Sequence, residues 1–339
     1  MATISLGRTP LVVLFRPEHV RYVLVEHPRH FSNRSMVQQD EGTASEGLLT
    51  IDGEQHRQQR RAVQPAFQKK RDEREHHDVL SMLLSAQDGE QPETKLTDKQ
   101  VHDHILTFLA AGHETTAIAL TWTFHLLSEH PQVREKLLDE MRTVLAGRTP
   151  SADDLARLPY LDWVLSESMR LYPPAWMQMR FVAKEVELDG VHLPVGTLLM
   201  LSQWVIHRLP DVWEDPEVFR PERWNPENGQ HIPPGAYFPF GGGPRMCIGM
   251  PFAQLEAKLI LATIFQNYTP QVVPGYKPGL QPTITLRPKR NLHVTLIPTA
   301  SNDSAGQWRQ LVRVPDASLY EGAERRGCRN AILGLFGLS

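Results

Sequence analysis

The stretch FPFGGGPRMCIGM, residues 238–250, combines three consecutive glycines, a proline and one of the two cysteines of the chain. A glycine backbone can approach a bound group closely, because no Cβ intervenes. An apolar helical pattern begins directly afterwards, near Gly249 or Pro251. A cysteine at a helix N-terminus beside Arg245 is expected to favour its thiolate, which suits a metal ligand. The alternative is a buried structural cysteine, which is the more usual role of a lone cysteine.

Composition excludes several classes of function. The chain has 339 residues, 41% of them hydrophobic, and a formal net charge of -3, with 36 basic against 39 acidic residues. That balance gives no electrostatic reason to expect a nucleic-acid partner. With only Cys247 and Cys328, a disulfide framework is not expected, and a cytoplasmic location is the default. No apolar run reaches the ~18 residues that a membrane span needs.

Hydrophobic periodicity predicts a mainly helical chain with a minor sheet. Thr97 and Gln100 form a capping-box pattern, and the helix that follows runs to about Glu129, before Pro131. Further helices are predicted over 131–145, over LDWVLSESMRLY and after Cys247. Asp189-Gly190 is typical of a hairpin turn, and TITLRPKRNLHVTLIP (283–298) indicates a final hairpin.

The centre of the long helix carries Gly112-His113-Glu114-Thr115-Thr116, where a core helix would favour Leu and Ala. A zinc-protease motif would place a second histidine one turn after His113. Ala117 stands there instead, so zinc is rejected.

Four segments together resemble the cytochrome P-450 superfamily, in the order found in that family. They are Ala111-Gly112-His113-Glu114-Thr115, Glu167-x-x-Arg170, Pro221-Glu222-Arg223-Trp224 with Trp in place of Phe, and Phe240-x-x-Gly243-x-Arg245-x-Cys247-x-Gly249. Glu-x-x-Arg alone is not specific, since helix surfaces are rich in such pairs. The resemblance runs from about residue 10 to residue 298.

The resemblance implies haem b (iron protoporphyrin IX) with Cys247 as the axial thiolate and the only protein ligand to the metal. Arg245 would pair with a haem propionate, as would His56 and Arg60 on an early helix. The remaining cofactor-binding residues implied by the family are Phe240, Gly243, Gly249, Arg180, Ala111 and Gly112. For His56 and Arg60 the segment alone favours a solvated basic helix face.

The resemblance also assigns roles on the distal and structural sides. Glu114 and Thr115 would be catalytic and deliver protons to dioxygen bound at the haem, with a local break in the helix hydrogen bonds beside them. Glu167, Arg170 and Arg223 would form a buried structural ion network under the cysteine loop. A substrate pocket would be lined by Ile105, Phe108, Leu109, Ala175, Trp176 and Met177, for which plain core packing is an equal alternative.

Three departures qualify the expected fold, an incomplete cytochrome P-450 fold over residues 1–298. PAFQKK runs almost directly into RDEREHHDVLSMLLSAQ, which indicates an internal deletion near 68–78 of helices that the family has. Residues 299–339, with Cys328, have no counterpart and are expected to be a poorly ordered tail. The usual N-terminal segment of the family is also missing from the sequence.

The leading interpretation is a haem-dependent monooxygenase. It would insert one oxygen atom of O2 into a lipophilic small molecule, with electrons from NAD(P)H through an external ferredoxin, flavodoxin or reductase. One alternative is a catalytically impaired or inactive truncated relic or isoform that binds haem or nothing. Another is a haem-thiolate isomerase or peroxide-using enzyme, which the Glu114-Thr115 pair disfavours.

Overall fold

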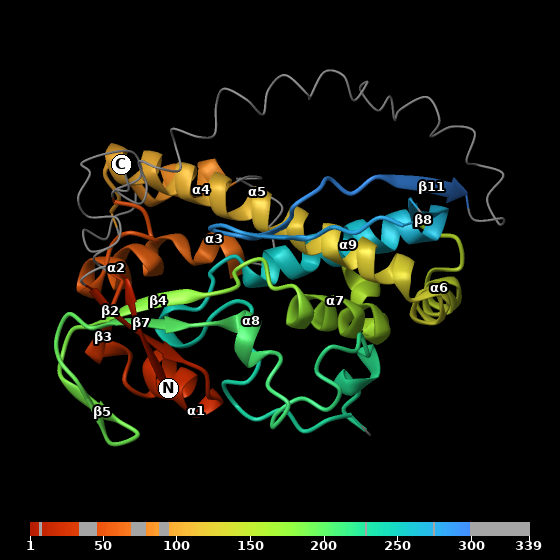
Figure 1. Ribbon diagram of the computed structural model, residues 1–339. Helices are drawn as coiled ribbons and strands as arrows, with labels where there is room; N and C mark the ends of the chain where they lie inside the picture. The colour runs from red at the N-terminus through yellow and green to blue at the C-terminus, as the bar shows by residue number, and fades with distance from the viewer. Residues whose placement is uncertain are drawn as a thin grey trace.

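The computed structural model describes residues 1–6, 9–33, 46–68, 79–87, 95–227, 229–273 and 275–298. These residues form a mainly helical protein with a minor β-sheet, as predicted. Figure 1 shows the long helix α5 (Asp98–Glu129) lying along the molecule, with the sheet near one end and α6 (Pro131–Leu145) and α7 (Pro159–Leu171) toward the other. The predicted internal deletion, residues 299–339 and Cys328 lie outside the described residues, apart from Gln68 at the end of a helix.

Local signals set the ends of the long helix. The Thr97 hydroxyl accepts the Gln100 N–H at 3.2 Å, and the Gln100 side chain accepts the Thr97 N–H at 3.0 Å. The predicted capping box is therefore confirmed. The helix ends at Glu129, and Pro131 opens α6, because proline needs no partner for an N–H in a first turn.

The main core lies where α5, α6, α7 and α9 (Met250–Asn267) meet. Each helix contributes apolar side chains that are almost completely buried, among them Leu127, Leu137, Leu161 and Phe265. Since α9 begins three residues after Cys247, this packing fixes the C-terminal side of the cysteine loop.

A five-stranded mixed sheet forms the second layer. Its order is β1 (Ala2–Leu6), β2 (Thr9–Leu14), β7 (Leu198–Leu201), β4 (Gln178–Val182) and β3 (Phe31–Ser32). The β2–β7 pair is parallel, and the other pairs are antiparallel. This sheet places Arg180 on β4 opposite Leu199 of β7.

The predicted turn at Asp189-Gly190 joins β5 (Val186–Leu188) to β6 (Val191–Leu193). Asp189 has φ 50° and Gly190 φ 73°. Positive φ at both central residues is what a two-residue hairpin of this hand requires, so the prediction is confirmed.

The hairpin predicted over residues 283–298 is wrong. β10 (Leu286–Pro288) pairs with β9 (Leu280–Pro282), whereas β11 (Val294–Pro298) pairs with the distant β8 (Tyr268–Val272). The Thr283 N–H donates to the Thr285 carbonyl at 3.1 Å and closes the shorter hairpin. The apolar strand β11 therefore pairs with β8, which precedes the hairpin in sequence. Hydrophobic periodicity alone does not show which strand is the partner of β11.

A third apolar cluster packs three short helices against the start of α5. They are α2 (Gly53–Val63), α3 (Pro65–Gln68) and α4 (Val79–Gln87). Val63, Leu83 and Val101 form its buried centre, and Ile248 from the cysteine loop packs at its edge. Two further short α-helices follow strands of the sheet in sequence: α1 (Pro17–Arg21) follows β2, and α8 (Gln203–Ile206) follows β7.

Candidate functional site

Backbone hydrogen bonds shape the loop that carries Cys247. The Gly241 N–H donates to the Phe238 carbonyl, and the Cys247 N–H donates to the Phe240 carbonyl, each at 2.9 Å. A 3₁₀ turn over Gly243–Arg245 separates these two bonds. Phe240 itself packs against the main core, while Cys247 is exposed.

Gly243 is required by sterics. Its φ is 62°, and a Cβ added to it would lie 1.7 Å from the Leu24 carbonyl oxygen. Leu24 belongs to a π-helical turn over Tyr22–Glu26, which follows α1 directly. The loop is therefore pressed onto this turn at a position that only glycine can occupy. Gly249 makes a looser approach, with its added Cβ 3.9 Å from the Cys247 sulfur.

The surroundings of Cys247 act on the pKa of its thiol in two opposite directions. Burial of one side of the thiol raises its pKa, and this outweighs the N–H groups of Gly249 and Met250 and the charge of Arg60, which lower it. The expectation that the loop by itself favours the thiolate is therefore wrong. Burial is the main cause of the raised pKa. Arg245 does not counter it, because its guanidinium is bound by Asp52 and by the carbonyls of Leu48 and Ile51.

The four basic side chains that the resemblance assigns to the haem propionates form a cluster, and Arg60 connects it to this cysteine. His56 and Arg180 lie near Arg245, and Arg60 lies near both Arg245 and Cys247. His56 and Arg180 are buried. Burial, with the charges of Arg245 and Arg60, lowers the pKa of His56 to about 4. Burial and Arg245 likewise lower the pKa of Arg180 to about 10. Burial also lowers the pKa of Arg60, with Arg245 acting in the same direction and Cys247 opposing both.

Asp52 is the acid that interacts with this basic cluster of His56, Arg60, Arg180 and Arg245. Burial is the main cause of the lowered pKa values of His56, Arg60 and Arg180, and repulsion by Arg245 acts in the same direction at each of them. Further carboxylates would relieve that repulsion, and guanidinium groups are suited to bind them in pairs. The basic cluster thus fits the two propionates of a haem, and Cys247 would supply one thiolate ligand to the iron. Among the described residues there is no cluster of three or more metal-ligating side chains.

The polar centre of α5 is continuous helix. The expected local break is wrong, because α5 runs uninterrupted from Asp98 to Glu129. The Thr115 hydroxyl donates to the Ala111 carbonyl at 2.6 Å. A Cβ added to Gly112 would meet no described atom within 4 Å, so packing does not explain this glycine.

Glu114 is directed toward the C-terminal strands. Its carboxylate accepts Arg287 Nε at 2.8 Å and also accepts the Thr285 hydroxyl. Both partners belong to or flank β10, more than 170 residues away in sequence. Of the two neighbouring polar residues, Thr116 is buried and His113 is exposed.

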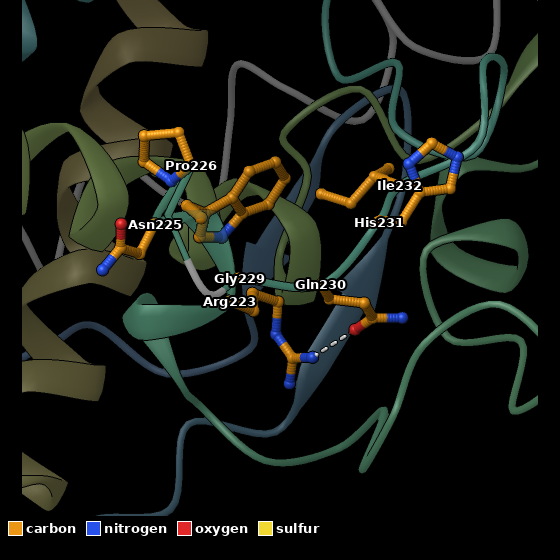
Figure 2. A pocket seen from close by; sticks show the side chains of 8 residues that line it. Arg223, Asn225, Pro226, Gly229, Gln230, His231 and Ile232 are labelled. Atoms are coloured by element: carbon orange, nitrogen blue, oxygen red, sulfur yellow. Dashed lines mark hydrogen bonds between the residues drawn. The ribbon is translucent and has the colours of Figure 1, made fainter.

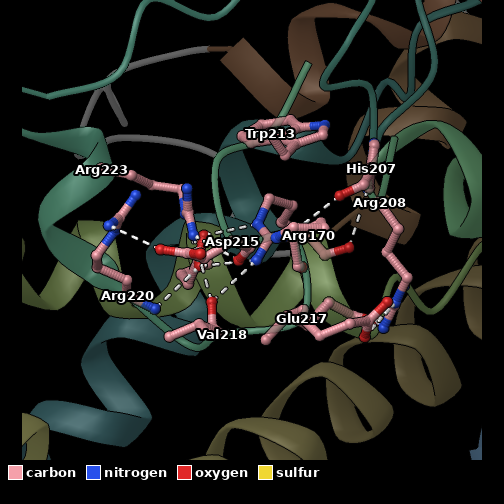
Figure 3. Close-up of polar contacts among 12 residues, drawn as sticks. Arg170, His207, Arg208, Trp213, Asp215, Glu217, Val218, Arg220 and Arg223 are labelled. Atoms are coloured by element: carbon pink, nitrogen blue, oxygen red, sulfur yellow. Dashed lines mark hydrogen bonds and ion pairs between the residues drawn. The ribbon is translucent and has the colours of Figure 1, made fainter. Parts of the chain in front are cut away.

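The structure brings Glu167, Arg170 and Arg223 together, and all three are buried. Glu167 Oε1 accepts Arg170 Nη2 at 2.9 Å and Arg223 Nε at 2.8 Å, while Oε2 accepts Arg170 Nε at 2.9 Å. The Arg220 N–H and the Trp224 indole N–H add donors at 3.0 and 2.9 Å. Figure 3 shows the two guanidinium groups converging, with further bonds to backbone carbonyls such as that of Val218. A buried carboxylate with this many donors is well compensated.

A shallow hollow of about 360 Å³ lies beside this ion network (Figure 2). Two of its lining residues are bonded to each other: Arg223 Nη1 donates to Gln230 Oε1 at 2.9 Å. The hollow is lined by residues of the same segment, namely Arg223, Trp224, Asn225, Pro226, Gly229, Gln230, His231 and Ile232. It carries none of the residues that the sequence predicted to bind a substrate.

The residues predicted to line a substrate pocket fall into different environments. Ile105 and Phe108 are half-buried in the third apolar cluster, near Ile248 of the cysteine loop. Leu109 is 66% exposed. The Trp176 indole N–H donates to the Thr283 carbonyl at 2.8 Å, which ties it to the β9–β10 turn. Ala175 and Met177, on either side of Trp176, are also half-buried.

Sequence reasoning missed several partners of these residues. Asp52 forms an ion pair with Arg245, but its place in the sequence predicts only the N-cap of a helix. Arg287 and Thr285 give no local signal, because their partner Glu114 lies on another element. Trp224 did carry a signal: the tryptophan found where the family has phenylalanine supplies an N–H that phenylalanine lacks.

Comparison with known proteins places these features in context. A family model described as cytochrome P450 matches residues 1–76 and 67–295. The chain is similar to cyclooctat-9-en-7-ol 5-monooxygenase of Streptomyces melanosporofaciens, with 44% identity over 61% of this chain and 45% of that protein. It is similar to pentalenene oxygenase of Streptomyces avermitilis, with 41% identity over 60% and 45%. It is 38% identical to cytochrome P450 3A13 of Mus musculus over 60% and 41%. The chain thus spans less than half the length of these relatives.

Proposed function

The chain belongs to the cytochrome P450 family, and on that premise we propose that it is a haem-dependent monooxygenase. It would insert one oxygen atom of O2 into a lipophilic organic molecule. The observation that carries the proposal is the cluster of His56, Arg60, Arg180 and Arg245, in which Arg60 lies near the only cysteine of the described residues, Cys247.

The residues of this cluster would hold haem b. Cys247 would ligate the iron as a thiolate, and the basic cluster would bind the two propionates. Phe240, Gly243 and Gly249 would shape the loop on the cysteine side, and Ala111 and Gly112 would leave space for the haem on α5. When bound, haem with an axial thiolate supplies oxygen activation, because the thiolate pushes electron density toward the iron and favours O–O cleavage.

Proton supply would be the task of Glu114 and Thr115. Thr115 Oγ1 lies one helix residue from Glu114 and already donates to the Ala111 carbonyl, so its lone pairs are free to accept a proton donor. The Glu114 carboxylate is 35% exposed and can exchange protons with solvent when it leaves Arg287. A carboxyl group that reaches solvent, next in sequence to a hydroxyl, supplies the two kinds of group that a proton relay needs.

A lipophilic substrate is supported by the apolar surroundings of Ile105 and Phe108 and by the names of two relatives, which act on pentalenene and on cyclooctat-9-en-7-ol. Electrons would come from NAD(P)H through an external ferredoxin, flavodoxin or reductase. No helix among the described residues has the length and apolar character that crossing a membrane requires. The proposal includes a cytoplasmic location, which the small number of cysteines supports.

The organisation of the chain is part of the proposal. Residues 1–298 would be one haem-thiolate domain, with helices deleted near 68–78 and an unmatched segment over 299–339. The family model matches in two pieces that overlap at 67–76, which supports a deletion at that place.

A second candidate is a haem-binding relic without turnover, and the exposure of Leu109 favours it. A leucine that is 66% exposed on α5 is expected where covering helices are missing. Exposed apolar surface costs roughly 25 cal/mol per Å², so the loss of several hundred Å² of burial weakens a marginally stable domain.

The carbon-monoxide difference spectrum of the purified, haem-reconstituted chain tests the proposal. We expect a thiolate-type spectrum that Cys247→Ala abolishes and Cys328→Ala leaves intact. A thiolate-type spectrum in the Cys247 variant would overturn the assignment. NAD(P)H-dependent conversion of a panel of terpene hydrocarbons then separates the two candidates, since the relic would show the spectrum and no product.

A further inference from the structure

His207 is a completely buried histidine between the ion network and the cysteine loop. It lies at the C-terminal end of α8, in sequence between α7 and the loop. Its Nδ1 lies 3.2 Å from the Arg170 carbonyl oxygen, and its Nε2 lies 3.1 Å from the Phe238 backbone nitrogen. Neither the family signatures nor the catalytic residues proposed above include it.

The two partners fix the protonation state of the ring. A carbonyl oxygen only accepts, so Nδ1 must carry the hydrogen. A backbone N–H only donates, so Nε2 must be the unprotonated nitrogen. Burial, together with the charges of Arg170 and Arg208, lowers the pKa of His207 to about 3 against the effect of its hydrogen bonds. The imidazole is therefore neutral and held in one tautomer.

His207 is tied to the ion network on one side. Besides the bond from its ring to the Arg170 carbonyl, its own carbonyl oxygen accepts Arg170 Nη1 at 2.8 Å. Arg170 in turn donates two hydrogen bonds to Glu167. Figure 3 shows His207 beside Arg170 at the edge of the network. The position of the His207 ring is therefore fixed to that of the buried Glu167–Arg170 pair.

On the other side, His207 holds the start of the cysteine loop. The backbone of Phe238, which donates to Nε2, accepts the Gly241 N–H through its carbonyl. Phe240 then accepts the Cys247 N–H at 2.9 Å. The ring also packs edge-on against Phe238, with centroids 5.4 Å apart. A short path of hydrogen bonds thus joins the ion network to the residue that carries the sulfur.

We propose that His207 is a positioning residue that connects the Glu167–Arg170 pair to the cysteine loop and thereby sets the direction of the Cys247 sulfur. The proposal rests on the function proposed above for Cys247. Imidazole suits this task because it donates at one edge and accepts at the other in a rigid ring. Phenylalanine keeps the ring and loses both bonds, whereas glutamine keeps a donor and an acceptor on a flexible stem.

The test compares His207→Phe, His207→Gln and, as a control, His192→Phe at an exposed position on β6, all in the full chain. Hydrogen exchange of the Phe238 amide is measured without haem, with the Leu137 amide in the main core as the internal reference. We expect His207→Phe to speed Phe238 exchange at least tenfold while leaving Leu137 within twofold. His207→Gln should recover part of the protection, and His192→Phe should match the parent.

The second readout is the fraction of bound haem that gives the thiolate-type carbon-monoxide spectrum. We expect this fraction to fall at least twofold in His207→Phe and to recover partly in His207→Gln. An unchanged Phe238 amide and an unchanged fraction in a folded His207→Phe variant overturn the proposal. If no protein, including the parent, shows the thiolate-type spectrum, the proposed function fails, while the amide still decides whether His207 holds the loop.

If His207→Phe does not fold, the protonation state of the His207 ring in the parent protein tests the proposal. Nitrogen NMR of the histidine-labelled chain should show His207 neutral, with hydrogen on Nδ1 from pH 5 to 8. A protonated ring, or hydrogen on Nε2, would remove the bond to Phe238 and overturn the proposal.

Discussion

The Glu114 carboxylate on α5 is paired with the Arg287 guanidinium on β10, with Arg287 Nε 2.8 Å from Oε1. The proposed proton donor and the C-terminal hairpin therefore form one unit. The same β9–β10 turn accepts the Trp176 indole N–H through the Thr283 carbonyl. Proton supply and one wall of the proposed substrate pocket are thus connected through residues 283–287.

Arg287→Gln should speed NAD(P)H consumption, if opening of this pair precedes each proton transfer. The two side chains are 49% and 35% exposed, so the pair contributes only about 0.2–1 kcal/mol and its loss should barely change stability. That energy corresponds to an acceleration of up to about fivefold. The rate is measured with purified variants and an excess of electron carrier. Arg290→Gln, an exposed arginine beyond β10, is the control, and equal rates in both variants would count against the relay.

Thr115→Ala should uncouple electron use from product formation. Without the hydroxyl, protons arrive in an uncontrolled manner and peroxide leaves. We expect at least a tenfold lower ratio of product to NAD(P)H, measured together with released hydrogen peroxide.

The matched control for that experiment is Thr121→Ala. Thr121 makes the same hydrogen bond to the carbonyl four residues earlier, at 2.7 Å from Ala117, on the same helix. Both variants lose an equivalent local bond, so only the position relative to the haem differs. If both variants keep the ratio of the parent, then Thr115 has a local structural role and the proposed relay is wrong.

The sequence predicted best where structure depends on neighbours along the chain. The Thr97–Gln100 capping box, the end of α5 before Pro131 and the Asp189-Gly190 turn are all local, and all are present. It failed where the outcome depends on distant segments. The pairing of β11 with β8 and the capture of Glu114 by Arg287 follow from tertiary packing, which no local pattern encodes.

The candidate site shows the same division. Family motifs pointed to Cys247 and to the basic cluster, and Arg60 of that cluster lies near Cys247. They did not reveal Asp52, which competes for Arg245 and leaves burial to raise the pKa of the Cys247 thiol. Electrostatics of this kind depend on the distances between elements rather than on the residues in one motif.

Trp224→Phe should destabilise the chain by about 1.5–3 kcal/mol, the usual contribution of a hydrogen bond to a charged group. The indole N–H donates to Glu167 Oε2 at 2.9 Å, and phenylalanine would leave that oxygen with one donor fewer. Urea unfolding of the chain without haem measures the change. Trp163→Phe, a partly buried tryptophan on α7 outside the ion network, controls for the loss of ring area. A smaller effect at Trp224 than at Trp163 would show that the bond is not important for stability.

His104 should make the stability of the chain depend on pH in weak acid. It is completely buried on α5, stacks on Phe108, and has no partner for either ring nitrogen among the described residues. Burial lowers its pKa to about 4, against a smaller opposing effect of Asp103. Between pH 6.5 and about 4 the unfolded chain binds a proton here that the folded chain does not, so stability falls as the pH falls. A pKa difference of this size corresponds to a loss of about 3 kcal/mol.

His104→Phe should make this pH dependence less steep, because phenylalanine keeps the stack on Phe108 and cannot bind a proton. His56 and His207, whose pKa values burial also lowers, keep their own contributions. Removing two unpartnered buried nitrogens should also raise stability at pH 7 by about 1–3 kcal/mol. Urea unfolding without haem at intervals from pH 7 to pH 4 measures both effects. His231→Phe, at an exposed histidine, should keep the slope of the parent. A parent slope that persists unchanged in His104→Phe would mean that other groups, such as His56 of the basic cluster, account for the proton uptake in acid.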